Sequence, residues 1–279
     1  MIYIFLSVCC SVFVSVLLKL SKRYEIDNRQ AITWNYSIAA LLTWLIYKPE
    51  IPEISPVYIS LGLLLPGIFV VLALSVQYTG IVKTDIAQRL SLFVPVLASY
   101  ILFSETFSGF KALGIIIAFI AIILSIPWKK EEGISDNRWL YPLIVFIGMG
   151  IIDILFKQIA KTTSVPFTSS LMVVFPLAFL LSLSYLLLLY FTGKMKFQLI
   201  NIICGWILGI ANFGNILFYL KAHQALSDTP SMVFSSMNIG VILLGSLVGI
   251  FIFKEKLSRL NYLGIVLALV SITVLYFAA

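Results

Sequence analysis

The chain has 279 residues, of which 61% are hydrophobic and only 11% are charged, and its net charge is +7. Because soluble domains usually carry about 25% charged residues, this composition argues against a water-soluble fold and indicates an integral membrane protein. The basic residues are scattered through short segments between apolar runs, which argues against a nucleic-acid-binding stripe and is typical of membrane-protein loops.

A membrane helix needs about 20 mostly apolar residues, and ten segments of the chain meet this requirement. In chain order, the predicted helices are approximately Ile2–Leu20, Ala31–Tyr47, Tyr58–Gly80, Ile86–Phe103, Gly109–Pro127, Trp139–Ala160, Phe167–Phe191, Leu199–Leu220, Met232–Phe253 and Leu260–Phe277. The most polar stretch, residues 129–138, divides them five and five. We therefore expect an all-α integral membrane protein with two five-helix domains, residues 1–128 and 139–279, joined by a polar linker over residues 129–138.

The two predicted halves share sequence. Residues 103–115, FSETFSGFKALGI, recur as residues 253–265, FKEKLSRLNYLGI, at an offset of 150 without a gap. The segment around Lys19 matches the segment around Lys157 at an offset of 138, and residues 75–87 align with residues 219–231 at 144. Because each half has an odd number of helices, the second copy enters the membrane from the opposite side. The sequence therefore predicts an inverted repeat, which can adopt two related conformations, each open to one side.

The distribution of Lys and Arg near the helix ends predicts the orientation. The loops after the odd-numbered predicted helices hold twelve of these residues, and the loops after the even-numbered ones hold five at most. Since cytoplasmic loops are enriched in basic residues, both chain ends are expected on the outside.

The residues of the repeat resemble a known family. Ten helices in two five-helix repeats, with Pro95 ten residues before Glu105 and Gly114 opening the next helix, resemble the EamA-type transporters of the drug/metabolite transporter superfamily. The second copy has Glu255 and Gly264 in the same roles.

The resemblance spans essentially the whole chain, although residues 238–240, Asn-Ile-Gly, replace the Val-Pro of the first copy. It implies a multi-pass transporter of small metabolites, amino acids or drug-like compounds, which we expect in the inner or plasma membrane of the cell. It does not identify the substrate, because a fold does not fix a function.

Polar groups inside a bilayer are costly, so their positions are informative. Asp153 lies near the middle of the sixth predicted helix and Lys157 follows four residues later, so the two side chains share one face and could form an ion pair. The pair either binds protons or substrate in a central cavity, or is a neutralised pair with Lys157 reaching the membrane interface. Lys19, the counterpart of Lys157, is a weaker cavity candidate, for which an interfacial position is favoured.

The eighth predicted helix carries four polar residues at steps of three, four and four, which are Asn212, Asn215, Tyr219 and His223. This stripe either lines a cavity or only cross-links helices, and cavity lining is slightly favoured. The ordinary pKa of histidine, about 6.5, suits proton coupling, but His223 is expected near the membrane surface. Gln77, at the end of the third predicted helix, is a further cavity candidate.

Other residues have structural interpretations beside functional ones. Asp85 and Arg89 at the start of the fourth predicted helix either anchor that start or act as a gate. Glu105 and Glu255 lie in the repeated turns and are expected to be structural caps. The glycine pairs 205/209 and 245/249 predict close helix packing.

These features predict a secondary active transporter that works by alternating access around a central cavity. Export of amino acids, metabolites or drug-like compounds is the leading expectation. Uptake of a sugar or an anionic metabolite is the alternative, which basic residues in or near the spans mildly favour. A passive channel or membrane scaffold is the alternative from another class.

An enzyme is not expected, because a single histidine and two intramembrane acids provide neither a metal cluster nor a nucleophile with its base. No metal site and no cofactor are expected. The expected partners are a small-molecule substrate, the lipid bilayer and protons as the coupling ion, with no nucleic acid. The chain is expected to act as a monomer or a weak homodimer.

Overall fold

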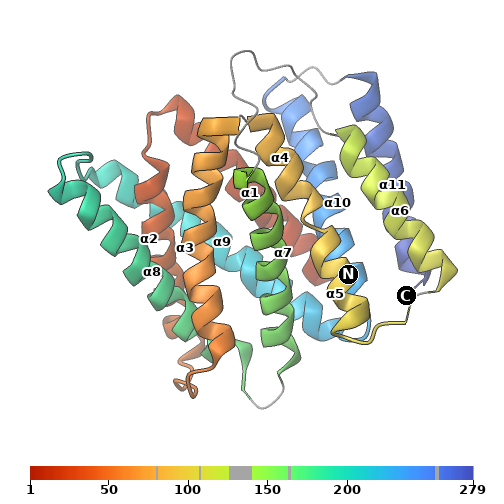
Figure 1. Cartoon of the computed structure of the whole chain (residues 1–279), viewed down its shortest axis with the longest axis horizontal. Coiled ribbons are helices and arrows are strands. Elements are labelled where there is room, and N and C mark those ends of the chain that lie inside the picture. Colours follow the sequence, from red (N-terminus) through yellow and green to blue (C-terminus); the bar gives the residue numbers. More distant parts are fainter. Residues whose placement is uncertain (80, 107, 126–139, 163–164, 255–257, 279) are drawn as a thin grey trace.

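The computed structural model describes residues 1–79, 81–106, 108–125, 140–162, 165–254 and 258–278, and over these ranges it contains helices and no strands (Figure 1). The linker predicted over residues 129–138 lies outside the described residues. The helices are α1 (Ile2–Arg23), α2 (Asn28–Tyr47), α3 (Pro56–Thr79), α4 (Ile81–Leu90), α5 (Phe93–Ile101), α6 (Gly109–Ser125), α7 (Leu140–Lys161), α8 (Phe167–Phe191), α9 (Leu199–Ala225), α10 (Pro230–Phe251) and α11 (Arg259–Ala278).

One helix that the sequence predicts as continuous is broken in the structure. The segment Ile86–Phe103 was expected to be continuous, but it contains the end of α4, a break and α5. The break precedes Pro95, which has no amide hydrogen to donate to the carbonyl oxygen of Ser91. That oxygen instead accepts from the amide of Val94 at 3.0 Å, and the chain turns at residues 91 and 92.

Among the described residues, six helices, α1 and α7 to α11, are long and apolar enough to cross a membrane. Three shorter apolar stretches lie in α3, in α4 with α5, and in α6. Many large apolar side chains are exposed on the surface of the molecule, and Phe191 and Phe277 expose 79% and 82% of their surface. Such a surface suits lipid and not water, so the chain is a multi-pass helical membrane protein.

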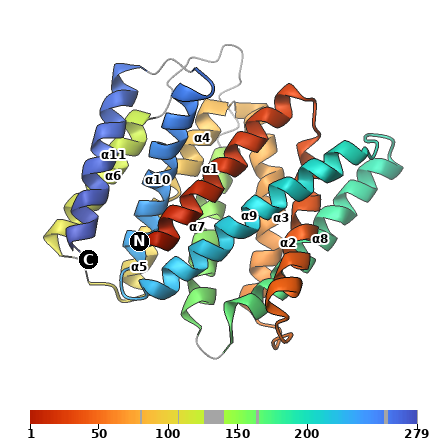
Figure 2. The ribbon, with the colours of Figure 1, turned by 180° about the vertical axis from the view of Figure 1, so that it is seen from behind.

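Helices from the two ends of the chain pack against each other around the centre of the molecule (Figure 2). α1 packs on α9 and α10, and α7 packs on α3 and α4. α6 and α11 pack on each other along one side, beyond α10. The core therefore consists of side chains from both predicted domains, which interlock.

The first predicted glycine pair lies where α9 crosses α2. A Cβ atom on Gly205 would lie 2.7 Å from the carbonyl oxygen of Ala31, and one on Gly209 would lie 2.6 Å from that of Asn35. The two backbones thus approach as closely as the pattern predicts. Gly245 of the second pair has no such neighbour in the described part of the chain, because no atom beyond the adjoining backbone of α10 lies within 4 Å of the position of its Cβ.

Candidate functional site

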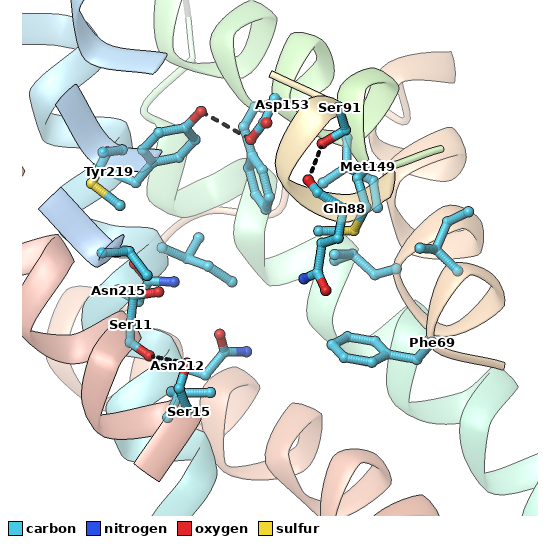
Figure 3. Close-up of a pocket in the computed structure, with 18 of the residues that line it drawn as sticks. Ser11, Ser15, Phe69, Gln88, Ser91, Met149, Asp153, Asn212, Asn215 and Tyr219 are labelled. Atoms are coloured by element: carbon cyan, nitrogen blue, oxygen red, sulfur yellow. Dashed lines mark hydrogen bonds between the residues drawn. The ribbon is translucent and has the colours of Figure 1, made fainter. Parts of the chain in front are cut away.

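A cavity of about 410 Å³ lies at the centre of the helices, between the two predicted domains (Figure 3). Its walls come from α1, α2, α3, α4, α7, α9 and α10, and its volume is within the roughly 300–1,000 Å³ of small-molecule sites. The polar side chains on its wall are Ser11, Ser15, Tyr36, Gln88, Arg89, Ser91, Asp153, Asn212, Asn215, Tyr219 and Asn238. Apolar side chains such as Phe69 and Met149 complete it.

Three residues of the predicted polar stripe reach this cavity from α9: Asn212, Asn215 and Tyr219. The two amides also link helices, because Asn212 donates to the side-chain oxygen of Asn35 at 3.1 Å. The side-chain oxygen of Asn215 accepts from the Ser7 hydroxyl at 2.8 Å. Both interpretations of the stripe therefore apply, since these side chains line the cavity and tie α9 to α1 and α2.

Asp153 lies on the cavity wall and accepts a hydrogen bond of 3.0 Å from the hydroxyl of Tyr219 (Figure 3). The predicted ion pair between Asp153 and Lys157 is wrong, because Lys157 turns to other partners. The spacing does place both residues on the same side of α7, but a shared face does not ensure contact.

Lys157 is fully buried, so its side chain does not extend to the surface, and it is not among the residues that line the cavity. Its ammonium group donates to the carbonyl oxygens of His223 at 3.3 Å and Ser227 at 3.0 Å. These oxygens lie at the C-terminal end of α9, where carbonyls lack helical partners and the helix dipole is negative. The ammonium group of Lys157 therefore binds the C-terminal end of α9 and not the carboxylate of Asp153.

His223 is also fully buried, so its ring is shielded from solvent. α9 continues five residues beyond the predicted end at Leu220, so His223 lies in its last turn. Its ring packs against those of Tyr219 and Phe234, each with its centroid 4.7 Å away. Neither ring nitrogen has a hydrogen-bond partner among the residues that the structure describes.

Lys19 is exposed in the last turn of α1 and is not among the residues that line the cavity. Its ammonium nitrogen lies 3.8 Å from the ring centroid of Phe253. The cavity wall on α1 ends one residue earlier, at Leu18.

Glu105 acts as a cap, but for a helix of the other predicted domain. Its carboxylate is buried and accepts from the amide of Ser231 at 2.9 Å and from the Ser231 hydroxyl at 2.6 Å. Lys111 neutralises it at 3.3 Å. The bond to the Ser231 amide satisfies an unpaired donor at the first turn of α10, where a negative charge is favourable.

Several predicted residues are not tested. The side chains of Gln77 and Asp85, and the whole of Glu255, lie outside the described part of the chain. Arg89 lines the cavity. Within the residues that the structure describes, no three His, Cys, Asp or Glu side chains gather as metal ligands would.

Some cavity residues escaped the sequence interpretation. Ser11 and Ser15 are four residues apart on the apolar α1 and share a face, a spacing that could have indicated them. Gln88 and Ser91 lie at the α4–α5 break, where the cavity reaches the backbone turn. These two residues were missed because Ile86–Phe103 was predicted as one continuous helix without a turn.

Comparison with known proteins gives a relative in sequence and a likeness in fold. No family model matches the chain. An uncharacterized protein of Haemophilus influenzae is 41% identical over 284 residues, which cover 97% of this chain and 96% of that protein. A protein of known crystal structure superposes with a TM-score of 0.69 over 100% of this chain and 98% of its own, at 11% identity. The latter likeness shows the fold alone.

Proposed function

The chain belongs to the same family as the uncharacterized Haemophilus influenzae protein, and we propose that it is a secondary transporter that moves a small solute by alternating access. The observation that carries this proposal is the central cavity of about 410 Å³ with acidic, basic and amide side chains on its wall. Such groups are rare within membrane helices and mark solute or ion pathways.

The proposal includes ten membrane crossings in two inverted halves, in which α4 and α5 together make one crossing. The packing supports this arrangement, because α1 packs on α9 as α7 packs on α3. In the sequence repeat, α1 corresponds to α7 and α3 corresponds to α9. The same arrangement is what the resemblance to EamA-type drug/metabolite transporters implies, and it belongs to this proposal.

The cavity wall favours a solute with polar ends and an apolar part. Asp153 suits a cationic group, Arg89 suits an anionic group, and Phe69, Met149 and Met237 provide apolar surface. An amino acid or a related metabolite has this chemistry, so export of such compounds from the inner or plasma membrane is the leading direction. Uptake of a sugar or an anionic metabolite is the second candidate, which Arg89 and the amides favour.

The test uses the purified chain in proteoliposomes with a panel of radiolabelled amino acids, sugars and anionic metabolites, with and without a proton gradient. We expect at least one solute to accumulate above its external concentration. The Asp153→Asn variant should lose this accumulation while it purifies normally, since the amide oxygen can still accept from Tyr219.

Three outcomes would contradict the proposal. Equilibration without accumulation indicates a passive channel, and no uptake of any solute indicates a scaffold. Recovery of a chemically changed compound indicates an enzyme. Unchanged accumulation and pH dependence in Asp153→Asn would remove Asp153 from the coupling step alone.

A further inference from the structure

A second cavity, of about 440 Å³, lies between α1, α2 and α9, and we call it the α1–α9 groove. Its walls come from the last two turns of α1, the start of α2 and the first ten residues of α9. α1 and α9 lie on the face of the molecule that is nearer the viewer in Figure 2. Leu18 lines both this groove and the central cavity, so α1 forms a wall of each.

The groove has a buried floor and an exposed rim. Ala31 and Leu208 are buried at its floor, whereas Ile200 and Ile207 are exposed. The exposed apolar face of α9 continues beside the groove at Trp206. Because such a face of a multi-pass membrane protein lies in lipid, the groove opens to the bilayer.

The polar groups of the groove are confined to one end. Ser21, Tyr24 and Asn28 lie where α1 passes into α2, and the Ser21 hydroxyl donates to the side-chain oxygen of Asn28 at 2.6 Å. Among the described residues that line the groove, the others are apolar or, at Cys204, a thiol. This wall suits a hydrocarbon chain and provides no group that would bind the polar end of a solute.

Two loops meet at the polar end of the groove. The backbone amide of Asp27, in the α1–α2 loop, donates to the side-chain oxygen of Asn201 at 3.2 Å. The side-chain amide of Gln30 donates to the carbonyl oxygen of Lys196, in the α8–α9 loop, at 2.9 Å. These bonds place the α8–α9 loop beside the end of the groove at which Ser21 and Asn28 lie.

The charges on these two loops favour an anion. Arg29 neutralises Asp27 at 2.8 Å. The exposed Lys194 and Lys196 of the α8–α9 loop then outweigh Glu25 of the α1–α2 loop. Basic residues next to a membrane surface attract anionic lipid headgroups. Charge complementarity therefore selects the lipid whose chain lies in the groove.

We propose that the α1–α9 groove binds an anionic phospholipid, with one acyl chain between α1 and α9 and the phosphate at the α8–α9 loop. Ile200 to Leu208 span about 12 Å at 1.5 Å per residue, so the groove holds the part of the chain that is next to the headgroup. The inference requires only that the chain lies in a membrane, and it holds whether or not the protein transports a solute.

The experiment uses the full chain in nanodiscs of phosphatidylcholine that contain a small fraction of a photoreactive lipid. The probe is phosphatidylglycerol with a diazirine in one acyl chain, and the matched probe is phosphatidylcholine with the same chain. Mass spectrometry of peptides measures crosslinking at residues 17–31 and 200–208, relative to the exposed face of α11 at Val266 and Leu269. We expect the phosphatidylglycerol probe to exceed the other about tenfold at the groove, with equal yields at α11.

One pair of variants tests the acyl-chain site. Cys204→Trp fills the groove from its wall and should lower crosslinking there to the level of α11. Ile203→Trp introduces the same side chain one residue away, at an exposed position that does not line the groove, and should leave the crosslinking unchanged.

A second pair of variants tests the headgroup site. Lys196→Gln should lower the preference for phosphatidylglycerol about fivefold, as expected for one lysine near a membrane surface. Lys48→Gln, at an exposed lysine that follows α2, is the matched control and should not change the preference. Both side chains are exposed, so neither change should impair folding.

Three results would overturn the proposal. Equal crosslinking at the groove and at α11 would show bulk lipid only, and equal yields of the two probes at the groove would remove the anionic headgroup. Dimers in native mass spectra that Cys204→Trp abolishes would show that a second copy of the chain fills the groove. If Cys204→Trp does not purify as a monodisperse protein, the crosslinks of the unchanged protein and of Lys196→Gln decide.

Discussion

At the scale of single residues, two buried tyrosines on the cavity wall differ in their hydroxyl groups. The hydroxyl of Tyr219 donates to Asp153, whereas the hydroxyl of Tyr36 has no hydrogen-bond partner. Tyr219→Phe should therefore destabilise the protein by about 0.5–2 kcal/mol, because it leaves a carboxylate without its donor in a membrane interior. Tyr36→Phe should be neutral or stabilising, because it removes an unpaired polar group.

Thermal unfolding of the two purified variants, beside the unchanged protein in the same detergent, measures this difference. The pair is well matched, since both changes remove one oxygen atom from a tyrosine that is at most 7% exposed. Equal midpoints for the two variants would show that the Tyr219–Asp153 bond does not contribute to stability.

Residue spacing predicted the cavity wall on α9 but not the partners of the charged groups. Steps of three and four bring Asn212, Asn215 and Tyr219 to one face in any helix, so the sequence sufficed. The partner of Lys157 is a set of backbone carbonyls, which every residue has and which no side-chain pattern reveals. The position of His223 depended on where α9 ends, and apolar length alone placed that end too early.

At the scale of helices, substitution by alanine should affect two glycines differently, because only one of them lies where α9 crosses closely over α2. A Cβ on Gly209 would lie 2.6 Å from the carbonyl oxygen of Asn35 and would also clash with Ile38. Backbone atoms cannot rotate away, so Gly209→Ala should destabilise the protein by about 1–3 kcal/mol. Gly245→Ala has open space and should be neutral or slightly stabilising, since alanine favours a helix.

The measurement is the midpoint of thermal unfolding and the yield of monodisperse protein for both variants. Gly245→Ala serves as the control, since it makes the same chemical change in another helix. If Gly209→Ala were as stable as Gly245→Ala, α9 and α2 would have to lie further apart than the structure places them.

The length of the apolar runs predicted where helices form, and the errors in the predicted helix boundaries have local causes. Nine of the ten predicted segments form a single helix over most of their described residues, and Ile86–Phe103 forms parts of two. Helices are expected there, because a backbone in lipid must satisfy its hydrogen bonds internally. The α4–α5 break was missed because a proline does not always interrupt a membrane helix, as Pro66 in α3 and Pro176 in α8 show. Only the tertiary surroundings decide which proline interrupts its helix.

At the scale of the whole molecule, the sequence repeat predicted that two halves meet, but not how they share their core. α1 lies on α9 and α10, and α7 lies on α3 and α4, so neither half encloses a core of its own. The cavity wall accordingly takes side chains from both halves.

The last prediction takes the orientation of the chain from its charge pattern. Basic residues concentrate in the loops at the upper end of the views, where α1 ends, such as Lys194 after α8 and Lys254 after α10, while both chain ends lie in the lower half of the views (Figure 1, Figure 2). Since basic loops face the cytoplasm, the upper end should face the cytoplasm and both chain ends should face the outside. A C-terminal fluorescent reporter that matures only in the cytoplasm should stay dark. A bright reporter would reverse the orientation.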